Sequence, residues 1–411
     1  MRIEERRIAR TLASAGLSAL AVTTVLGLVA TPALGTPPEI SATSLAAPAA
    51  PAALWSAEAL SALQMEVMAA AGEGLDPGAY DLAALKGRAP GIETDRIANA
   101  IALALADDYS RGRVDDPSRL SWHIARRAGP DALASGLRAA LAANRVAAWL
   151  RGLLPQDSRY AALRSALASA QDNATRDRLR ANMERWRWMP RDLGKDHIYV
   201  NVPSYTLAVV DEGKPVSTYT VVVGAPKTPT PQIAVEARSV VVNPWWNVPR
   251  SIAGSIKPGA GKGYVFSGGS VRQKPGPGNA LGRVKIDMPN PHSIYLHDTP
   301  SKALFAKESR AFSHGCIRVK DIDKLAAELL ELDRGDSSEV SRALAQAGTR
   351  TVALQRTRPV YLVYFTADVG ADGRLVTYED PYGRDAKLLA SLDRHTRLAA
   401  KSIPAGTRSG S

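Results

Sequence analysis

The chain has 411 residues, of which 45% are hydrophobic and 22% charged, and its formal net charge at pH 7 is +12. This composition excludes a wholly disordered or fibrous chain and predicts about two globular domains. The positive charge is not gathered into dense Lys/Arg runs interleaved with aromatic residues, so we expect no nucleic-acid partner. An anionic wall or membrane surface fits the charge better, with plain solubility as the alternative.

Residues 1–35 have the pattern of an export segment. Four arginines among the first ten residues precede an uncharged, apolar run over residues 12–33. Small residues near its end fit cleavage as a signal peptide, while a run of about 20 residues is also long enough to remain as an anchor in the inner membrane. We therefore expect a periplasmic or cell-envelope protein, with a Pro/Ala-rich linker over residues 36–54.

Residues 55–185 are rich in Ala, Leu and Arg with helical spacing. Apolar residues recur at intervals of four, as in Ile97, Ile101, Leu105 and Tyr109. Glycine and proline pairs break the pattern, which predicts about five helices between residues 57 and 170. No candidate catalytic group occurs here, so we interpret this stretch as a helical scaffold domain that supports the rest of the chain.

Residues 190–390 have a different sequence pattern, in which short runs rich in β-branched residues are separated by turn residues. These runs cover residues 197–202, 205–211, 216–223, 234–242, 351–355, 359–366 and 375–378. Few helices interrupt them, which predicts a mostly antiparallel β-sandwich and makes the whole chain an α+β protein. We expect a loose C-terminal tail over residues 391–411.

A Gly-, Pro- and Lys-rich segment over residues 248–283 interrupts the strands and shows little periodicity. A loop this long inside a compact domain is usually functional, and a plain surface excursion is the alternative. The pair Gly268-Gly269 is not a phosphate-binding loop, because no Gly-Lys-Ser/Thr sequence follows it at the start of a helix.

The one cysteine of the chain, Cys316, follows Ser313, His314 and Gly315, and a second histidine, His297, lies 19 residues upstream. A thiol attacks as its thiolate, which needs a nearby base or positive charge to lower a free pKa of about 8.5. This pattern is typical of a cysteine nucleophile. The alternative is that Cys316 is a small buried apolar residue and that both histidines are incidental.

Strand periodicity shows how these side chains converge. Tyr295 and His297 share one face of a predicted strand, and Cys316 and Arg318 share one face of another. Arg318 is then placed to favour the thiolate, which predicts a Cys316 pKa below that of a free thiol. The amides around Gly315 and Cys316 are candidate donors to an oxyanion.

A helix is predicted directly after these residues. Asp321 is its expected N-cap, and Gly335 its expected end. The apolar face follows helical spacing through Ile322, Leu325, Ala326, Leu329 and Leu330.

His297 together with Ser313-His314-Gly315-Cys316 resembles the pattern of L,D-transpeptidases with a YkuD-type catalytic domain. Segments over residues 182–188, 243–249, 277–282 and 294–300 are similar to the larger YcbB-like subgroup. Two departures are Arg318, where the wider family often has Asn, and the lack of a recognisable peptidoglycan-binding insert before Asn182. The resemblance implies that residues 248–283 form a substrate-capping loop.

The resemblance also implies the roles of the site residues. Cys316 is expected to be the nucleophile and His297 its general base, oriented by the backbone carbonyl of Asp298. His314 is an alternative base or, like Gly315, shapes the site, and Ser313 and Arg318 set the environment of the thiolate. The candidate substrate-binding residues are Trp246, Tyr295 and Asn279, although we favour packing as the role of the tryptophans, Trp246 included.

The implied substrates are peptidoglycan stem peptides, as both donor and acceptor. The donor tetrapeptide loses D-Ala to form an acyl-enzyme, which passes to an amine as a 3→3 cross-link, and carbapenems are implied to acylate the same sulfur. No cofactor is expected, and no metal, because the histidines and the cysteine are too few and wrongly spaced for structural zinc.

Two other classes of protein remain open. One is a hydrolase, either a peptidoglycan carboxypeptidase or an NlpC-like peptidase, although in the latter the cysteine precedes its histidines. The other is a catalytically silent wall-binding scaffold. The sequence does not decide between cross-linking, lipoprotein attachment and exchange of the terminal D-amino acid, and it predicts no oligomeric state.

Overall fold

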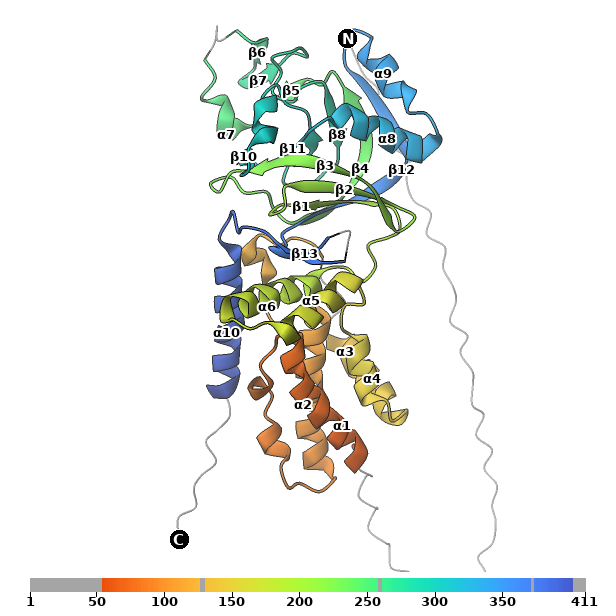
Figure 1. The fold of residues 1–411 in the computed structure, drawn as a ribbon, viewed down its shortest axis with the longest axis vertical. Helices are drawn as coiled ribbons and strands as arrows, with labels where there is room; N and C mark the ends of the chain where they lie inside the picture. Colours follow the sequence, from red (N-terminus) through yellow and green to blue (C-terminus); the bar gives the residue numbers. More distant parts are fainter. Residues whose placement is uncertain (1–53, 126–129, 258–260, 371–372, 402–411) are drawn as a thin grey trace, which may run out of the picture. The chain divides into compact units, whose positions relative to one another are not determined.

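The computed structural model describes residues 54–125, 130–257, 261–370 and 373–401 (Figure 1). The predicted export segment and nearly all of the predicted linker lie outside these residues. Among the helices that are described, none combines the length and the apolar character needed to cross a membrane.

The first part of the described chain is a helical domain. Five α-helices lie between residues 57 and 170, as predicted, and a sixth follows. Their bounds, with those of the short 3-10 helices, are α1 (Ala57–Ala69), η1 (Ala70–Glu73), η2 (Pro77–Ala79), η3 (Leu82–Leu85), α2 (Ile92–Arg111), η4 (Pro117–Leu120), α3 (Pro130–Ala142), α4 (Val146–Gly152), α5 (Ser158–Ser169) and α6 (Asn173–Trp188). Ile101, Leu105 and Tyr109 of α2 are buried, which confirms the predicted face.

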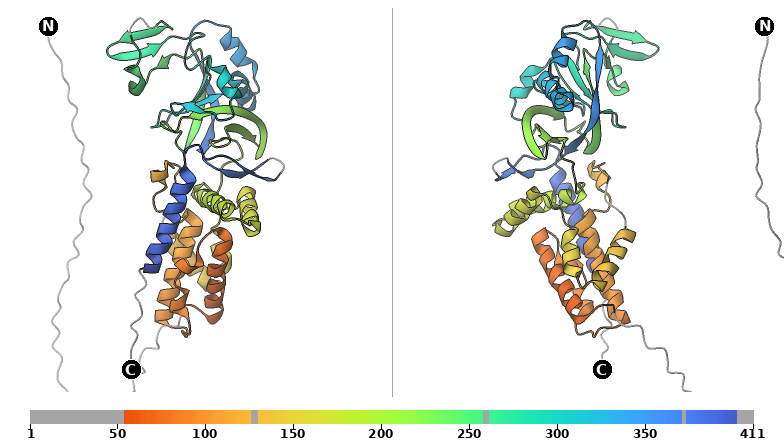
Figure 2. Two further views of the ribbon diagram at one scale, coloured as in Figure 1. Left: turned by 60° about the vertical axis from the view of Figure 1, so that its left-hand side comes forward. Right: turned by 90° about the vertical axis from the view of Figure 1, so that its right-hand side faces the viewer.

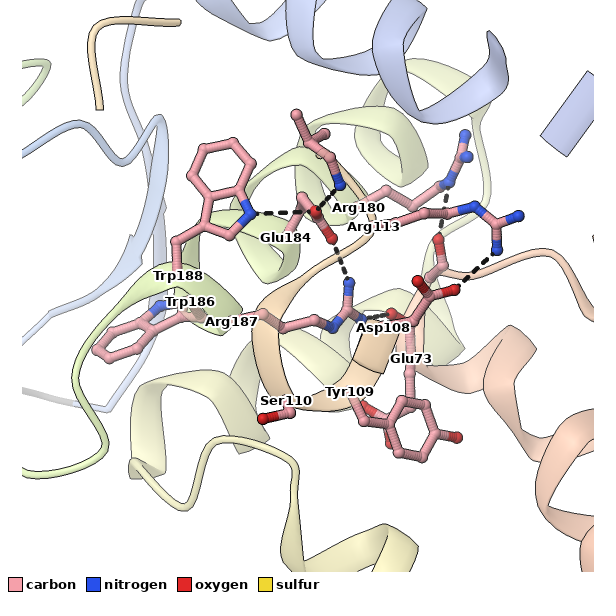
Figure 3. A network of polar contacts seen from close by, with 12 residues as sticks. Glu73, Asp108, Tyr109, Ser110, Arg113, Arg180, Glu184, Trp186, Arg187 and Trp188 are labelled. Carbon is pink, nitrogen blue, oxygen red and sulfur yellow. Dashed lines mark hydrogen bonds and ion pairs between the residues drawn. The ribbon is translucent and has the colours of Figure 1, made fainter. Parts of the chain in front are cut away.

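One side of α6 is held in the helical domain by a buried polar network (Figure 3). Glu184 accepts hydrogen bonds from Trp188 Nε1 at 3.1 Å and from the Val114 N–H at 2.9 Å, and it pairs with Arg187 at 2.9 Å. Arg187 also donates to the Glu73 carbonyl and to the Tyr160 hydroxyl. Because both charges of this pair are fully buried and hydrogen-bonded, the network fixes the position of α6.

The opposite side of α6 holds the segment that leads out of the β domain. The Asn182 side chain donates to Thr366 Oγ1 at 2.8 Å and accepts from the Thr366 N–H at 2.9 Å. Arg185 pairs with Asp385 at 2.6 Å, and Trp186 packs on Phe365 with ring centroids 5.1 Å apart. Residues 182–188 therefore join the two domains, which explains why polar and aromatic residues alternate there.

Replacing Asn182 with alanine is expected to destabilise the protein. Asn182 is fully buried, and its loss leaves the Thr366 N–H without a partner, which costs about 1–3 kcal/mol. The urea midpoint of the fluorescence transition measures this effect. Asn173→Ala, at the exposed start of the same helix, is the matched control and should change the midpoint little. Equal midpoints for the two variants would contradict this role of Asn182.

The β domain is built on one sheet with the strand order β10-β3-β11-β9-β8-β4-β12-β1-β2. Its strands are β1 (His197–Asn201), β2 (Thr206–Asp211), β3 (Lys214–Gly224), β4 (Ile233–Val242), β8 (Val284–Asp287), β9 (Leu296–His297), β10 (Ala311–Ser313), β11 (Ile317–Val319) and β12 (Arg350–Val363). Most pairings are antiparallel, while β1–β12, β10–β3 and β11–β9 are parallel. The α+β class is confirmed.

Two details of the sheet differ from the prediction. Because β2 pairs with β3 as well as with β1, one sheet closes on itself, where two separate sheets were expected. The runs over residues 351–355 and 359–366 were predicted as separate strands, but both belong to the single strand β12. Only residues 364–366 of the second run lie beyond the end of β12. A register shift between Ala353 and Arg358 marks an irregularity, which accounts for the gap in the sequence pattern.

Helix α8 (Ile322–Arg334) covers the β-domain core and is followed by α9 (Ser338–Leu344). All five residues of its predicted apolar face are buried, and Gly335 ends it in the left-handed conformation. The N-cap residue is Asp321, as predicted, but the capping does not come from its side chain. Asp321 has a φ of 52° and its side chain makes no capping bond, so only its backbone carbonyl accepts from the first turn.

The segment predicted as a tail from residue 391 is helical through Lys401. After the hairpin of β13 (Ala367–Val369) and β14 (Leu375–Thr377), helix α10 (Arg384–Lys401) runs along α6. Leu388 and Leu392, four residues apart, are buried against the helical domain and stabilise this last helix.

The predicted loop over residues 248–283 also contains regular structure. Short helix α7 (Arg250–Ala253) is followed by a hairpin of β6 (Tyr264–Ser267) and β7 (Ser270–Gln273), and β5 (Trp246–Asn247) pairs with β7. Gly268 and Gly269 form the two-residue turn with φ values of 52° and 77°, which glycine adopts freely. We call residues 248–283 the capping segment, after its predicted role. Its hairpin of β6 and β7 stands beside the main sheet in Figure 2.

Candidate active site

The site is built on the parallel pair β9 and β11, where Ile317 lies opposite Leu296 and Arg318 opposite His297. Ile317 and Leu296 are fully buried in the core of the β domain. Strand alternation then places the neighbouring residues, Tyr295 and His297 from one segment and Cys316 and Arg318 from the other, on the opposite face. The predicted convergence of these four side chains is confirmed by the register.

His297 is 5% exposed and packs edge-on against the Tyr295 ring, with centroids 5.5 Å apart. Burial, followed by the positive charge of Arg318, lowers its pKa to about 3. The imidazole is therefore neutral at physiological pH and able to accept a proton. Its Nδ1 atom makes no well-formed hydrogen bond within the described residues, but the Asp298 backbone interacts with the ring and opposes the lowering of its pKa. Orientation of the ring by the Asp298 carbonyl stays a prediction.

Cys316 is half-buried and its thiol lies 3.6 Å from the Ser293 carbonyl. Burial raises the pKa of this thiol, against the opposing effects of Tyr295, Lys285 and Arg318. The predicted lowering of the Cys316 pKa is therefore wrong, because Arg318 is itself partly buried and does not outweigh the loss of water. The resting site holds a neutral thiol and a neutral imidazole.

Alkylation of Cys316 by iodoacetamide is expected to be slower at pH 7 than alkylation of a model thiol. Since burial raises the thiol pKa, the thiolate fraction is small at pH 7 and the rate should rise through the alkaline range. Stopped samples at several pH values, analysed by intact mass, measure this profile. A rate that reaches its plateau below the pKa of a free thiol would contradict the neutral resting state.

The side chains of Trp246, Tyr295 and Cys316 form a short chain of contacts. The Tyr295 side chain hydrogen-bonds with Cys316 and with Trp246, and burial together with the neighbouring thiol raises the Tyr295 pKa. Lys285 Nζ lies 4.5 Å from the centroid of the Tyr295 ring. A neutral tyrosine hydroxyl beside the sulfur is suited to donate a hydrogen bond when the thiolate forms.

The turn before Cys316 is held by side-chain hydroxyls. Ser313 Oγ donates to the Cys316 carbonyl at 2.6 Å and accepts from the Gly315 N–H at 3.1 Å. Thr230 Oγ1 donates to the Gly315 carbonyl at 2.8 Å. Gly315 has a φ of 109°, and a Cβ there would lie 3.3 Å from Ile294 Cδ1, so a glycine is required.

These bonds correct the predicted oxyanion donors. The Gly315 N–H is already committed to Ser313, whereas the Cys316 N–H donates to none of the described residues. Only the second of the two predicted amides is therefore available to an oxyanion.

Asp298 fixes the base of the capping segment. Its carboxylate accepts from the Arg283 N–H at 2.9 Å and pairs with Lys302, which belongs to η5 (Lys302–Ala306), while its own N–H donates to Val284. A Cβ at Gly282 would lie 2.3 Å from this carboxyl group, so a glycine is required there too. Asp298 thus positions His297 through the strand, and its backbone also interacts with the imidazole.

Asn279 is not available to a substrate. It is 1% exposed, and its side chain donates to the Pro244 and Lys274 carbonyls at 3.0 Å and 2.9 Å and accepts from the Leu281 N–H at 2.7 Å. Its role is to hold the capping segment together. Of the predicted substrate-binding residues, Tyr295 lies beside the sulfur and Trp246 contacts Tyr295, whereas Asn279 holds the fold of the segment.

Two cations face the sulfur. Arg318 is half-buried, its Nε has no hydrogen-bond partner within the described chain, and no ion pair of this residue is formed there. Lys285 pairs with Asp287 at 2.6 Å. By contrast, His314 is exposed, and within the described residues its side chain forms no hydrogen bond with Cys316.

Sequence reasoning missed the residues that support the turn and the loop facing Cys316. Thr230 holds Gly315, and the His123 ring of the helical domain lies 4.7 Å from the His292 ring, next to Ser293. His123 also donates its N–H to Gln232 of the β domain at 2.7 Å. These residues lie far from the motif in the chain, so only the fold brings them to it. No group of three His, Cys, Asp or Glu suited to a metal ion occurs in the part of the chain described.

The structure is a helical domain followed by a β-rich domain that presents a cysteine and a buried histidine on one face of its sheet, an arrangement suited to a cysteine-dependent acyltransferase. Residues 195–353 match the sequence profile of the YkuD L,D-transpeptidase catalytic domain, and residues 49–167 match that of a scaffold domain. The chain therefore carries a YkuD-family L,D-transpeptidase catalytic domain preceded by a scaffold domain.

The chain is similar in part to one sequence relative and to solved structures. A Haemophilus influenzae protein assigned to the L,D-transpeptidases is 33% identical over 250 residues, which are 54% of this chain and 50% of the relative. The chain thus matches half the length of that relative. An L,D-transpeptidase from Mycobacterium smegmatis aligns over 41% of this chain and 58% of its own, at 15% identity and a TM-score of 0.25. L,D-transpeptidase 1 of Mycobacterium tuberculosis aligns over 41% and 61%, at 17% identity and a TM-score of 0.23. Scores this low add no argument about fold.

Proposed function

We propose that this protein transfers the acyl group of a peptidoglycan stem tetrapeptide to an amine of a second stem, forming a 3→3 cross-link. The observation that carries the proposal is the placement of Cys316, Tyr295 and His297 on one face of the sheet, within a domain of the L,D-transpeptidase family. The scaffold match further supports membership of the YcbB-like subgroup.

In the first half-reaction, the Cys316 thiol gives its proton to the neutral His297 as the sulfur bonds to the carbonyl carbon of the donor peptide bond. The thiolate and the imidazolium stabilise each other as they form, which offsets the low pKa of His297 in the resting site. The Cys316 N–H donates to the resulting oxyanion. The leaving amine of D-Ala takes the proton from His297, and a thioester remains.

In the second half-reaction, the acceptor amine attacks the thioester carbon. The amine loses a proton to His297, the carbon–sulfur bond breaks, and the proton returns to Cys316, so the enzyme is regenerated. Water in place of the amine gives the hydrolase. Partial burial of the thiol reduces access of water to the thioester, which favours transfer.

The charge of the site supports an anionic substrate. Residues 248–283 contain six Lys or Arg residues and no Asp or Glu, namely Arg250, Lys257, Lys262, Arg272, Lys274 and Arg283. Stem peptides carry free carboxylates, which this segment and Arg318 attract. A wall substrate places the protein in the periplasm or cell envelope, and carbapenems, as acylating analogues, are expected to modify Cys316.

Incubation of the purified protein with stem tetrapeptide, with and without a stem amine acceptor, tests the reaction. Mass spectrometry should show loss of D-Ala and an amide-linked dimer when the acceptor is present. Tripeptide as the product in both incubations would assign the protein to the carboxypeptidases. An unchanged tetrapeptide would favour the catalytically silent scaffold.

A further inference from the structure

A large groove lies between the helical domain and the outer side of β1 and β2, away from the residues of the active site. Its volume is about 860 Å³. Asp368 and Val369 of β13 line one wall, and Figure 1 shows β13 between the β1–β2 pair and helices α5 and α6. The side chains from β2 are small or aliphatic, namely Thr206, Ala208 and Val210. A cavity of this size at a domain junction is typical of a ligand site.

Two groups in the groove have hydrogen-bonding capacity that no described residue uses, the Tyr199 hydroxyl and the second carboxylate oxygen of Asp368. Tyr199 is 7% exposed, and its hydroxyl is enclosed without a hydrogen bond to any described residue. Asp368 is 8% exposed, accepts one bond from the Val369 N–H at 2.9 Å, and forms no ion pair within the described residues. Because unsatisfied buried polar groups are costly, both are explained by a ligand that supplies the missing partner.

Aromatic and cationic groups complete the groove. The Arg159 guanidinium lies over the rings of Trp186 and Tyr199, 4.6 Å and 4.9 Å from their centroids, and it pairs with Asp157 at 2.8 Å. Arg159 therefore has little charge left to attract an anion. The free oxygen of Asp368 and the Tyr199 hydroxyl instead call for hydrogen-bond donors on the ligand.

We propose that this groove binds the glycan strand of the wall polymer as a neutral, hydroxyl-rich saccharide. Hydroxyl and acetamido N–H groups of the sugars donate to the Asp368 carboxylate and bond with Tyr199, while Arg159 donates to ring or acetyl oxygens. The near balance of Asp157, Asp368 and Arg159 disfavours a strongly charged ligand. The choice of wall glycan over other saccharides rests on the proposed function.

A saccharide site here also supplies wall attachment in a chain with no recognisable binding insert. The groove is formed by residues of both domains, so a bound glycan also contacts the helical domain. The stem peptides branch from the same polymer, and holding the strand raises the effective concentration of stems at Cys316. Turnover of polymeric wall then depends on the groove, whereas turnover of a free tetrapeptide does not.

Calorimetric titration of the full protein with a tetramer of N-acetylglucosamine, which carries no peptide, tests the proposal. The parent should bind it, Tyr199→Phe should weaken binding about fivefold and Asp368→Asn about tenfold or more, from the loss of one neutral or one charged hydrogen bond. Tyr199→Phe removes only an unpartnered hydroxyl, so the variant is expected to fold. The matched control is Asp323→Asn, on the exposed face of α8.

Each outcome decides the proposal. No binding by the parent, or equal binding by the parent and both groove variants, overturns it, and so does binding of only the deacetylated, cationic tetramer. Tyr199→Phe should also retain turnover of free tetrapeptide while slowing turnover of limiting wall sacculi by up to about fivefold. Saccharide binding without any peptide turnover would support the groove as a saccharide site. It would refute the proposed acyl transfer instead.

Discussion

Replacing Cys316 with serine is expected to abolish acyl transfer, with turnover reduced by about 10⁴-fold or more, to the background of the assay. A serine hydroxyl has a far higher pKa than a thiol, and His297, whose own pKa is about 3, is too weak a base to activate it. The substitution changes one atom in a half-buried side chain, so the fold should be retained. Release of D-Ala from stem tetrapeptide measures the loss.

The control for Cys316→Ser is its thermal unfolding midpoint, which should match that of the parent within a few degrees. Labelling with iodoacetamide should also disappear, because Cys316 is the one cysteine of the chain. Release of D-Ala by the serine variant at a tenth of the parent rate would show that another group performs the chemistry.

Replacing His297 with alanine is expected to slow the formation of the acyl-enzyme by about 10²–10⁴-fold, the usual effect of a lost general base. The thiol remains, but its proton has no acceptor on the same face of the sheet. The loss should shrink as the pH rises, because hydroxide then generates the thiolate directly. Single-turnover rates from pH 6 to pH 10 measure both effects.

The matched control for this experiment is His314→Ala. His314 is exposed and lies within the Ser313–Cys316 motif, so its loss tests whether this histidine serves as the base. We expect less than a tenfold effect. A larger loss in His314→Ala than in His297→Ala would reverse the assignment of the base.

The sequence predicted those features that depend on local periodicity. Alternation placed His297 and Cys316 on the same face, and the spacing of apolar residues from Ile322 to Leu330 predicted the buried side of α8. The strands of the β domain were found because β-branched residues favour a half-buried, pleated surface. The helix over residues 391–401 was missed because its stability comes largely from packing Leu388 and Leu392 against the helical domain.

Features that depend on burial or on the three-dimensional geometry of the site were not predictable from the sequence. Arg318 indicated a stabilised thiolate, but burial, which no local pattern reports, outweighs its charge. Asn279 was assigned to the substrate, although its amide is satisfied by backbone carbonyls brought together by the capping segment. The Gly315 N–H was predicted to donate to an oxyanion, but it already donates to Ser313 Oγ. The sequence does not show this bond, because it depends on the geometry of the turn.

The central claim is that Cys316 carries the acyl group, and the most direct test is to trap that intermediate. The protein is mixed with stem tetrapeptide in the absence of an amine, quenched in acid within the first turnover and digested. The account predicts that the peptide containing Cys316 gains the mass of the tripeptide acyl group, and that an equal amount of D-Ala is released. Release of D-Ala in the first turnover with an unmodified Cys316 peptide, or with the acyl group on another residue, would contradict it.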